Sequence, residues 1–376
     1  MQRRLFLKST LGAPLLFTAT SKANKQPIKA LKNSNEYLIA RTTHSGQHQV
    51  ATISIEGEIL TSFDVPSRQH SFAINSKKNQ IISVGRRPSK YIVIADVDKD
   101  ASFSVTAKQG RHFYGHGVFC KDQRFLYTTE NDYAGAKGVI GVRDSENEYK
   151  QVAEFPSYGV GPHQILLSKD KNIIFVANGG VATHPQSGRK KLNLGVMQPN
   201  LAMIDAHSKQ LIERISLPEI QRQNSIRHFA MKHDGQLILA LQNQALNKRH
   251  EVLLAQYHLG SEKVEKIAIP FEIQMKLNSY IGDVVFDSSS QFFAASAPKG
   301  NHILIYKSSG EFMAALEITD ACGLNATNNE GEFLVATGLG EIMFLSKHNQ
   351  WQPENRQLHR DSKWDNHMII KNNLFF

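Results

Sequence analysis

Histidine is the residue type whose spacing in this sequence could most readily do chemistry. Five histidines each stand at the start of an apolar stretch: His70, His116, His163, His228 and His367. Asp283 holds the same position before Val284-Val285-Phe286. Imidazoles that converge on one cavity can bind copper, iron or zinc, or serve as axial ligands to a haem. The five histidines and Asp283 are therefore candidate metal ligands.

The spacing of these positions indicates how they could be brought together. With Ala321-Cys322-Gly323 as a seventh member, they recur at intervals of 40 to 65 residues, and most are followed by a polar turn and a second apolar stretch. A repeat of roughly 40–45 residues with several strands per unit is typical of a β-propeller blade. The first strand of each blade lines the central channel, so the histidines should meet at one mouth of that channel.

The two ends of the chain should contribute to one blade. Three strand-forming stretches, 36–41, 48–54 and 58–65, have no histidine-headed stretch before them, whereas the stretch that starts at His367 has no complete blade after it. Pairing of the C-terminal strand with the N-terminal blade would remove exposed sheet edges. The sequence therefore predicts an all-β, seven-bladed propeller that forms a single domain over residues 36–376.

The N-terminus indicates export. Gln2-Arg3-Arg4-Leu5-Phe6-Leu7-Lys8, followed by a short apolar run, resembles a twin-arginine signal. We expect a signal over residues 1–23, a polar linker over 24–35 and a periplasmic protein. No other segment is long and apolar enough to span a membrane, so none is expected after signal cleavage.

Composition limits the classes of partner. The chain has 376 residues, and its formal net charge falls from +10 to +6 once residues 1–23 are removed. No basic stripe interleaved with aromatic residues appears, so nucleic acid is not an expected partner. Cys120 and Cys322 fall in non-adjacent blades, and we expect two unbridged thiols.

The long loops should lie on the same face as the histidines. They carry Arg86 and Arg87, the insert 179–200 with His184, Arg189 and Asn193, and further Lys and Arg residues. A positively charged cleft attracts anions and disfavours bare cations. An anionic ligand, such as a chelated metal, a haem with propionates or a carboxylate, therefore fits this rim better than a free metal ion; a solvated basic rim is the alternative.

Several motifs resemble a bacterial family catalogued as domain of unknown function 1513. They are Gly161-Pro-His-Gln, Val176 to Pro185, Ser187 to Leu194, Met197-Gln-Pro-Asn-Leu201, Ser225-Ile-Arg-His228 and Trp364-Asp-Asn-His367. The resemblance implies a propeller of the YVTN/quinoprotein-amine-dehydrogenase-like type. It also implies a link to periplasmic iron uptake beside imelysin-like and di-haem peroxidase-like proteins. Matching positions add His184, Arg189, Asn193, Gln198 and Arg227 to Arg86 and Arg87 as candidate ligand-binding residues.

The sequence predicts no particular reaction. It contains no nucleophile elbow, phosphate-binding loop, metalloprotease helix or dinucleotide fingerprint. We expect a protein that binds a metal, iron or copper, or a metal-bearing anionic ligand such as haem, and serves iron acquisition. Two alternatives stay open: a lactonase-like hydrolase, and a protein-interaction platform in which the histidines hydrogen-bond neighbouring strands and lock the blades together.

Overall fold

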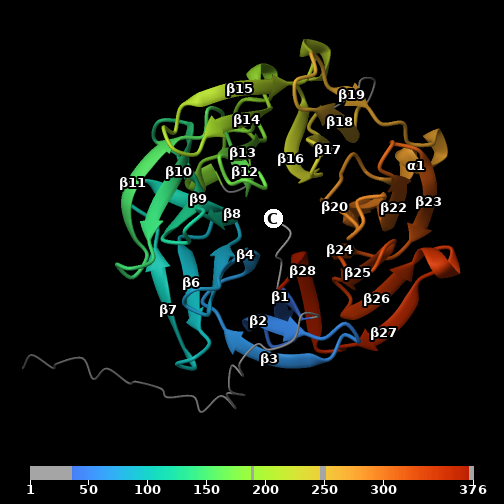
Figure 1. Ribbon diagram of the computed structural model, residues 1–376, viewed down its shortest axis with the longest axis horizontal. Helices are drawn as coiled ribbons and strands as arrows, with labels where there is room; N and C mark the ends of the chain where they lie inside the picture. The colour runs from blue at the N-terminus through green and yellow to red at the C-terminus, as the bar shows by residue number, and fades with distance from the viewer. Residues whose placement is uncertain (1–35, 188–189, 246–250, 372–376) are drawn as a thin grey trace, which may run out of the picture.

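Seven antiparallel four-stranded sheets are arranged radially around a central channel (Figure 1). The computed structural model describes residues 36–187, 190–245 and 251–371, so the expected export signal and linker lie outside the described residues. Each sheet is one blade, and its innermost strand lines the channel. The prediction of an all-β, seven-bladed propeller is confirmed.

The blades follow one another along the chain. The first consists of β28 (Ser362–Ile370), β1 (Tyr37–Thr43), β2 (His48–Ile53) and β3 (Ile59–Asp64). The second and third contain β4 (Gln69–Asn75), β5 (Gln80–Gly85), β6 (Tyr91–Asp96) and β7 (Ala101–Thr106), then β8 (Arg111–Phe119), β9 (Phe125–Asp132), β10 (Lys137–Asp144) and β11 (Lys150–Pro156). The fourth and fifth contain β12 (Pro162–Leu167), β13 (Ile173–Asn178), β14 (Asn200–Asp205) and β15 (Leu211–Ser216), then β16 (Asn224–Met231), β17 (Gln236–Asn243), β18 (Leu254–His258) and β19 (Glu265–Lys266). The last two contain β20 (Asp283–Phe286), β21 (Phe292–Ala297), β22 (His302–Lys307) and β23 (Phe312–Glu317), then β24 (Ala321–Ala326), β25 (Glu332–Thr337), β26 (Glu341–Ser346) and β27 (Glu354–Leu358).

Burial falls from the channel side of each blade to its rim. The middle strand β5 is buried along its whole length, whereas β27 is exposed along its whole length. Middle strands carry continuous apolar runs because both of their faces pack against neighbouring blades. Seven apolar clusters fill the fold, most of them bridging adjacent blades. The inner strands are thereby held in fixed positions around the channel.

The two ends of the described chain close the ring. β28 pairs antiparallel with β1, with Tyr37 opposite Ile370, as the sequence predicts. The ammonium group of Lys371 then donates to Oε2 of Glu36 at 2.8 Å, in a pair that is largely shielded from water. The first blade is therefore assembled from both ends of the sequence.

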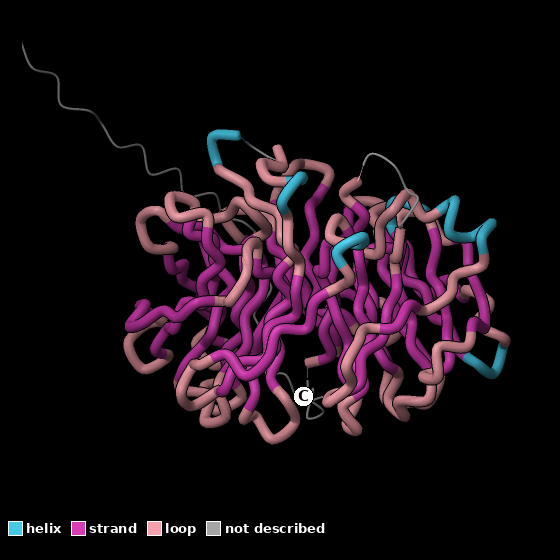
Figure 2. The backbone as a smooth tube through the Cα atoms, turned by 90° about the horizontal axis from the view of Figure 1, so that it is seen from above, coloured by secondary structure: helices cyan, strands magenta, loops and turns pink. Residues whose placement is uncertain are grey.

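The loops divide between two faces. We call the face at which the inner strands begin the histidine face, and the face at which they end the far face. The described helical segments are short: α1 (Phe271–Lys276), η1 (Pro185–Ser187), η2 (Leu194–Val196), η3 (Glu219–Gln221), η4 (Pro298–Gly300) and η5 (Lys347–Asn349). Most of them lie on one side of the disc (Figure 2). No helix in the described ranges is long and apolar enough to cross a membrane.

Candidate metal centre

An irregularity in strand pairing lies at or beside each of the five histidines, which we call the hub histidines: His70 (β4), His116 (β8), His163 (β12), His228 (β16) and His367 (β28). On β4, Gln69 and Ser71 pair with Gly85 and Val84, so that His70 is an extra residue between them. A β-bulge of this kind re-aims a side chain and is common beside functional sites. The bulges direct the imidazoles into the hub of the propeller.

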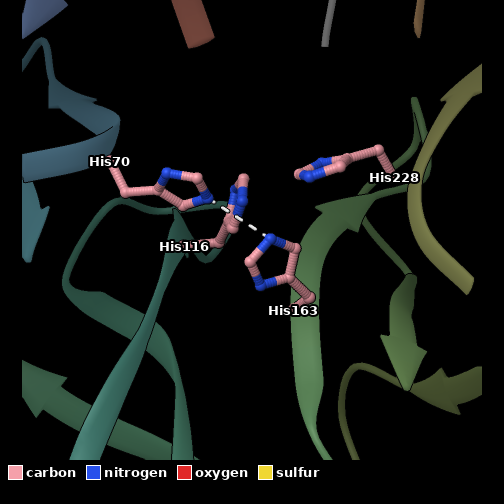
Figure 3. Close-up of side chains that lie close together, drawn as sticks. All are labelled: His70, His116, His163 and His228. Carbon is pink, nitrogen blue, oxygen red and sulfur yellow. Dashed lines mark hydrogen bonds between the residues drawn. The ribbon is translucent and has the colours of Figure 1, made fainter. Parts of the chain in front are cut away.

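The hub histidines converge as the sequence predicts. One ligand atom from each of His70, His116, His163 and His228 lies within 4.8 Å of the others (Figure 3). His228, Asp283 and His367 form a second set with the same spacing. The Nε2 atoms of His70 and His163 are 3.2 Å apart, and the ring centroids of His228 and His367 are 4.4 Å apart. Six side chains from six blades thus meet at one point.

In each hub histidine one ring nitrogen is buried without a partner. All five hub histidines are at most 8% exposed. Nδ1 of His70, His163 and His228 and Nε2 of His116 and His367 are shielded from water and have no hydrogen-bond partner. A buried polar atom without a partner costs free energy, and it requires an explanation such as a missing ion or water. These atoms do not lock the blades together, since they bond to no neighbouring strand.

The electrostatics keep the cluster neutral. Burial lowers the pKa of His70, His116, His163 and His228 well below the ordinary histidine value, and mutual repulsion between the imidazolium forms adds to the effect. A neutral imidazole has a lone pair on one ring nitrogen, which is the form that binds a metal. These four neutral imidazoles in contact therefore form a set of donors rather than a set of charges.

A carboxylate orients His367. Nδ1 of His367 donates to Oδ2 of Asp283 at 2.7 Å, which leaves Nε2 free to face the hub. Metal-binding histidines commonly donate their second nitrogen to a carboxylate in this way. His367 has a φ of 68°, which is unusual for a residue other than glycine. The neighbouring Asp365 is held by ion pairs with Arg68 and Arg86.

Gly115 makes room for His70. This glycine precedes His116 in the bulge of β8, and its φ is +104°. A Cβ atom at this position would overlap the imidazole of His70. The close approach requires glycine both for its conformation and for the space. The packing of two hub histidines therefore depends on one residue without a side chain.

The predicted basic residues have different surroundings. Arg86 donates to Oδ1 of Asp365 at 2.8 Å, and the Arg87 guanidinium lies over the ring of Tyr114 at 5.7 Å. Nε of Arg227 is buried and has no hydrogen-bond partner. Burial lowers the pKa of Arg227 to about 10, with a smaller effect of the charge on Arg87. Arg86 is thus paired with a carboxylate that it shares with Arg68, whereas Arg227 is a cation whose Nε has no partner.

The candidate ligand-binding residues of the insert 179–200 mainly stabilise the insert itself. The amide of Asn193 accepts from Ala182 N at 2.7 Å and donates to Gly180 O at 2.8 Å. The ring of His184 packs against Tyr133, with the centroids 5.2 Å apart. Gln198 is exposed, and Arg189 lies outside the described residues. The structure brings none of the described members of this group into the histidine cluster.

Comparison with known proteins identifies the family. Residues 63–371 match the family described as a protein of unknown function, DUF1513. The chain belongs to the DUF1513 family. No curated relative matches it. The DUF1513 fold is similar to hydrazine synthase of Kuenenia stuttgartiensis, with a TM-score of 0.60 and 10% identity over 79% of this chain and 89% of that one.

A second solved structure has the same architecture. A chain of a structure titled "Crystal Structure of Mitotic Checkpoint Complex" matches with a TM-score of 0.53 and 11% identity, over 90% of this chain and 86% of that one. At sequence identities of 10% and 11%, these two comparisons show a similar fold and nothing more. The function of this DUF1513 member has to be argued from its own hub.

Other features of the site have no clear signal in the sequence. The bulges, the Asp283–His367 hydrogen bond and the ion pairs of Asp365 join residues far apart in the chain. Gly115 directly precedes His116, and this glycine is a feature of the sequence that could have indicated the bulge. The two cysteines are unbridged, as expected: Cys120 is half-buried and Cys322 is buried.

Proposed function

We propose that this DUF1513 protein binds a transition-metal ion at its hub histidines. The observation that carries the proposal is the convergence of four buried imidazoles, one ligand atom of each lying within 4.8 Å of the others, in a cluster where every ring has a nitrogen without a hydrogen-bond partner. Imidazole suits iron, copper, zinc and nickel, whereas magnesium and calcium prefer oxygen ligands. His70, His116, His163 and His228 would bind the ion, and His367, oriented by Asp283, would join them.

The hub fits an ion better than a haem. The imidazole rings contact one another, with centroids 4.7 Å apart for His163 and His228 and 4.8 Å apart for His116 and His163. A planar macrocycle cannot enter between rings at this spacing without moving the bulges. The proposal therefore takes iron or copper as the ion and gives haem no place among these rings.

An anion beside the metal is part of the proposal. The charge on Arg227 acts on His163 and His228, and Gly179 packs against the Arg227 side chain without a Cβ. A guanidinium presents several donors in a plane and pairs well with carboxylate or phosphate. An anionic ligand on the histidine face would give Arg227 the partner that its Nε lacks. This supports a metal-bearing anionic ligand as the cargo.

The proposed cellular role rests on the sequence and on the family resemblance. The N-terminal twin-arginine pattern supports export to the periplasm, and the family resemblance supports an accessory role in iron acquisition beside imelysin-like or di-haem peroxidase-like partners. A binding protein with a buried metal needs no catalytic group. The proposed function is therefore metal binding within a periplasmic uptake system.

The first experiment is elemental analysis of the exported, untagged protein. We expect a near-stoichiometric transition metal, and we expect its loss when His116, His163 and His228 are changed together to Ala. His112→Ala and His302→Ala are matched controls, because both histidines are buried but lie outside the cluster. Circular dichroism reports whether each variant folds.

One outcome would reject the proposal. A wild-type protein that carries no metal and gains none on titration with iron, copper or zinc salts would leave the hub without a metal function. The protein-interaction alternative would then be tested by deletion of the insert 179–200.

A further inference from the structure

A chamber lies in the central channel on the far side of the hub. Its volume is about 930 Å³, and its wall is built from the inner strands of the blades. Far-face turn residues such as Gln123, Lys169 and His233 lie at its other end. Ligand cavities typically measure about 300–1,000 Å³. The chamber is thus large enough for a ligand and is reached from the face opposite the basic loops.

The wall of the chamber carries an apolar sleeve. Five half-buried aliphatic side chains from five blades line it: Ile74, Val118, Leu166, Val285 and Ile369. They follow the hub residues along the inner strands β4, β8, β12, β20 and β28. Apolar side chains that remain partly exposed inside a fold offer contact surface to an apolar molecule.

Several polar side chains beside the sleeve are engaged with the protein, whereas Lys169, Lys171 and His233 lie at the far-face end of the chamber. Oε1 of Gln164 accepts from Phe229 N at 2.7 Å, and Nδ2 of Asn325 donates to Met368 O at 2.6 Å. Lys371 is paired with Glu36. A charged ligand would lose its hydration in this sleeve without gaining partners. The wall therefore favours a small uncharged ligand.

One side of the hub faces this chamber. His116, Asp283 and His367 line it, whereas His70, His163 and His228 do not. Nε2 of His116 and Nε2 of His367 are the ring nitrogens without partners in these two residues. We propose that the chamber delivers a small uncharged ligand, of the size of dioxygen or nitric oxide, to the metal from the far face, on the side formed by His116 and His367.

This inference rests on the proposed metal site but can fail separately from it. The test uses full-length protein loaded with copper(I) and carbon monoxide as the probe, with infrared absorption as the readout. Val118→Phe and Val285→Phe each narrow the sleeve, and Val196→Phe makes the same change on the exposed η2 segment of the histidine face. We expect either sleeve variant to slow carbon monoxide binding roughly tenfold or more, with Val196→Phe unchanged.

A substitution that widens the sleeve distinguishes a blocked channel from a misfolded protein. Leu166→Ala widens the sleeve, and we expect faster carbon monoxide binding with the copper content retained. Copper-loaded protein that binds no carbon monoxide, or that binds it at the same rate in the wild type and all sleeve variants, would overturn the chamber proposal while leaving metal binding intact. Failure to load copper or iron at all would instead overturn the metal site.

Discussion

Two histidines on strand β8 show how differently this fold treats the same side chain. His112 is 1% exposed, and both its ring nitrogens have partners: Nδ1 lies 3.0 Å from Phe113 O and Nε2 lies 3.0 Å from Nδ2 of Asn131. His116 is 4% exposed, and its Nε2 has no partner. Burial alone does not leave an imidazole unsatisfied in this protein, so the free nitrogens of the hub point to a ligand.

Strand β24 extends the comparison to the seventh blade. Cys322 takes the place of the histidine there, also at a bulge, and its thiol lies 3.3 Å from Trp364 O. This blade packs into the ring without a hub histidine. The propeller therefore does not need an imidazole at this position to hold adjacent blades together, which weakens the alternative that the histidines serve only as locks.

The largest expected effect concerns folding stability at low pH, which should depend more on the hub histidines than on His112. Burial lowers the pKa of His112 to about 4 and lowers those of His70, His116, His163 and His228 well below the ordinary value. Below about pH 6.5 the unfolded chain binds protons that the folded protein does not, so stability falls as pH falls, by about 1.4 kcal/mol per pH unit for each histidine.

Urea unfolding of metal-free protein between about pH 7 and about pH 5 measures this contrast. In the variant with His116, His163 and His228 changed to Ala, the free energy of unfolding should lose most of its pH dependence. In His112→Ala it should lose only the part contributed by one histidine. Equal slopes in the two variants would contradict the idea that the hub is a cluster of coupled neutral imidazoles.

Gly115→Ala should have the next largest effect. The new methyl group would overlap the His70 ring and displace it, so we expect metal affinity to fall about 10–100-fold. Gly110→Ala is the matched control, because Gly110 also has a positive φ, +79°, but nothing lies within 4 Å of the position its Cβ would take. Metal titration of both variants measures the difference; the same loss in Gly110→Ala would assign the effect to backbone strain.

Asp283→Asn should have the smallest effect. The amide keeps the size of the carboxylate but removes the charge that orients His367, so we expect metal affinity to fall about tenfold with the fold intact. Competition titration with a chelator and thermal unfolding without metal separate the two properties. A loss of stability without a loss of metal affinity would show that the Asp283–His367 pair stabilises the closed propeller rather than the metal site.

The fold could be predicted from the sequence because the repeat is carried by apolar stretches. Their alternation with polar turns marks each inner strand, and the unpaired stretches at the two ends predict the closure by β28 and β1. The short helix α1 could not be predicted, since its six residues follow no long apolar periodicity.

The candidate site could be predicted only in its outline. The residue types and their places at strand starts indicated which side chains would meet, but not how close the rings would come. That depends on the bulges, which follow from pairing between strands and have no signature in a single strand. The ion pair between Arg86 and Asp365 could not be predicted either, because the two residues are brought together only by ring closure.

Closure by β28 also has a consequence for the order of events during biosynthesis. His367 and the strand that completes the first blade are synthesised after the strands of the other six blades, whereas His70 is made early. A nascent or C-terminally truncated chain lacks a hub histidine and the strand beside it. The proposed metal site would therefore be complete only in chains in which β28 has been made and has paired with β1, and metal loading would distinguish these chains from shorter ones.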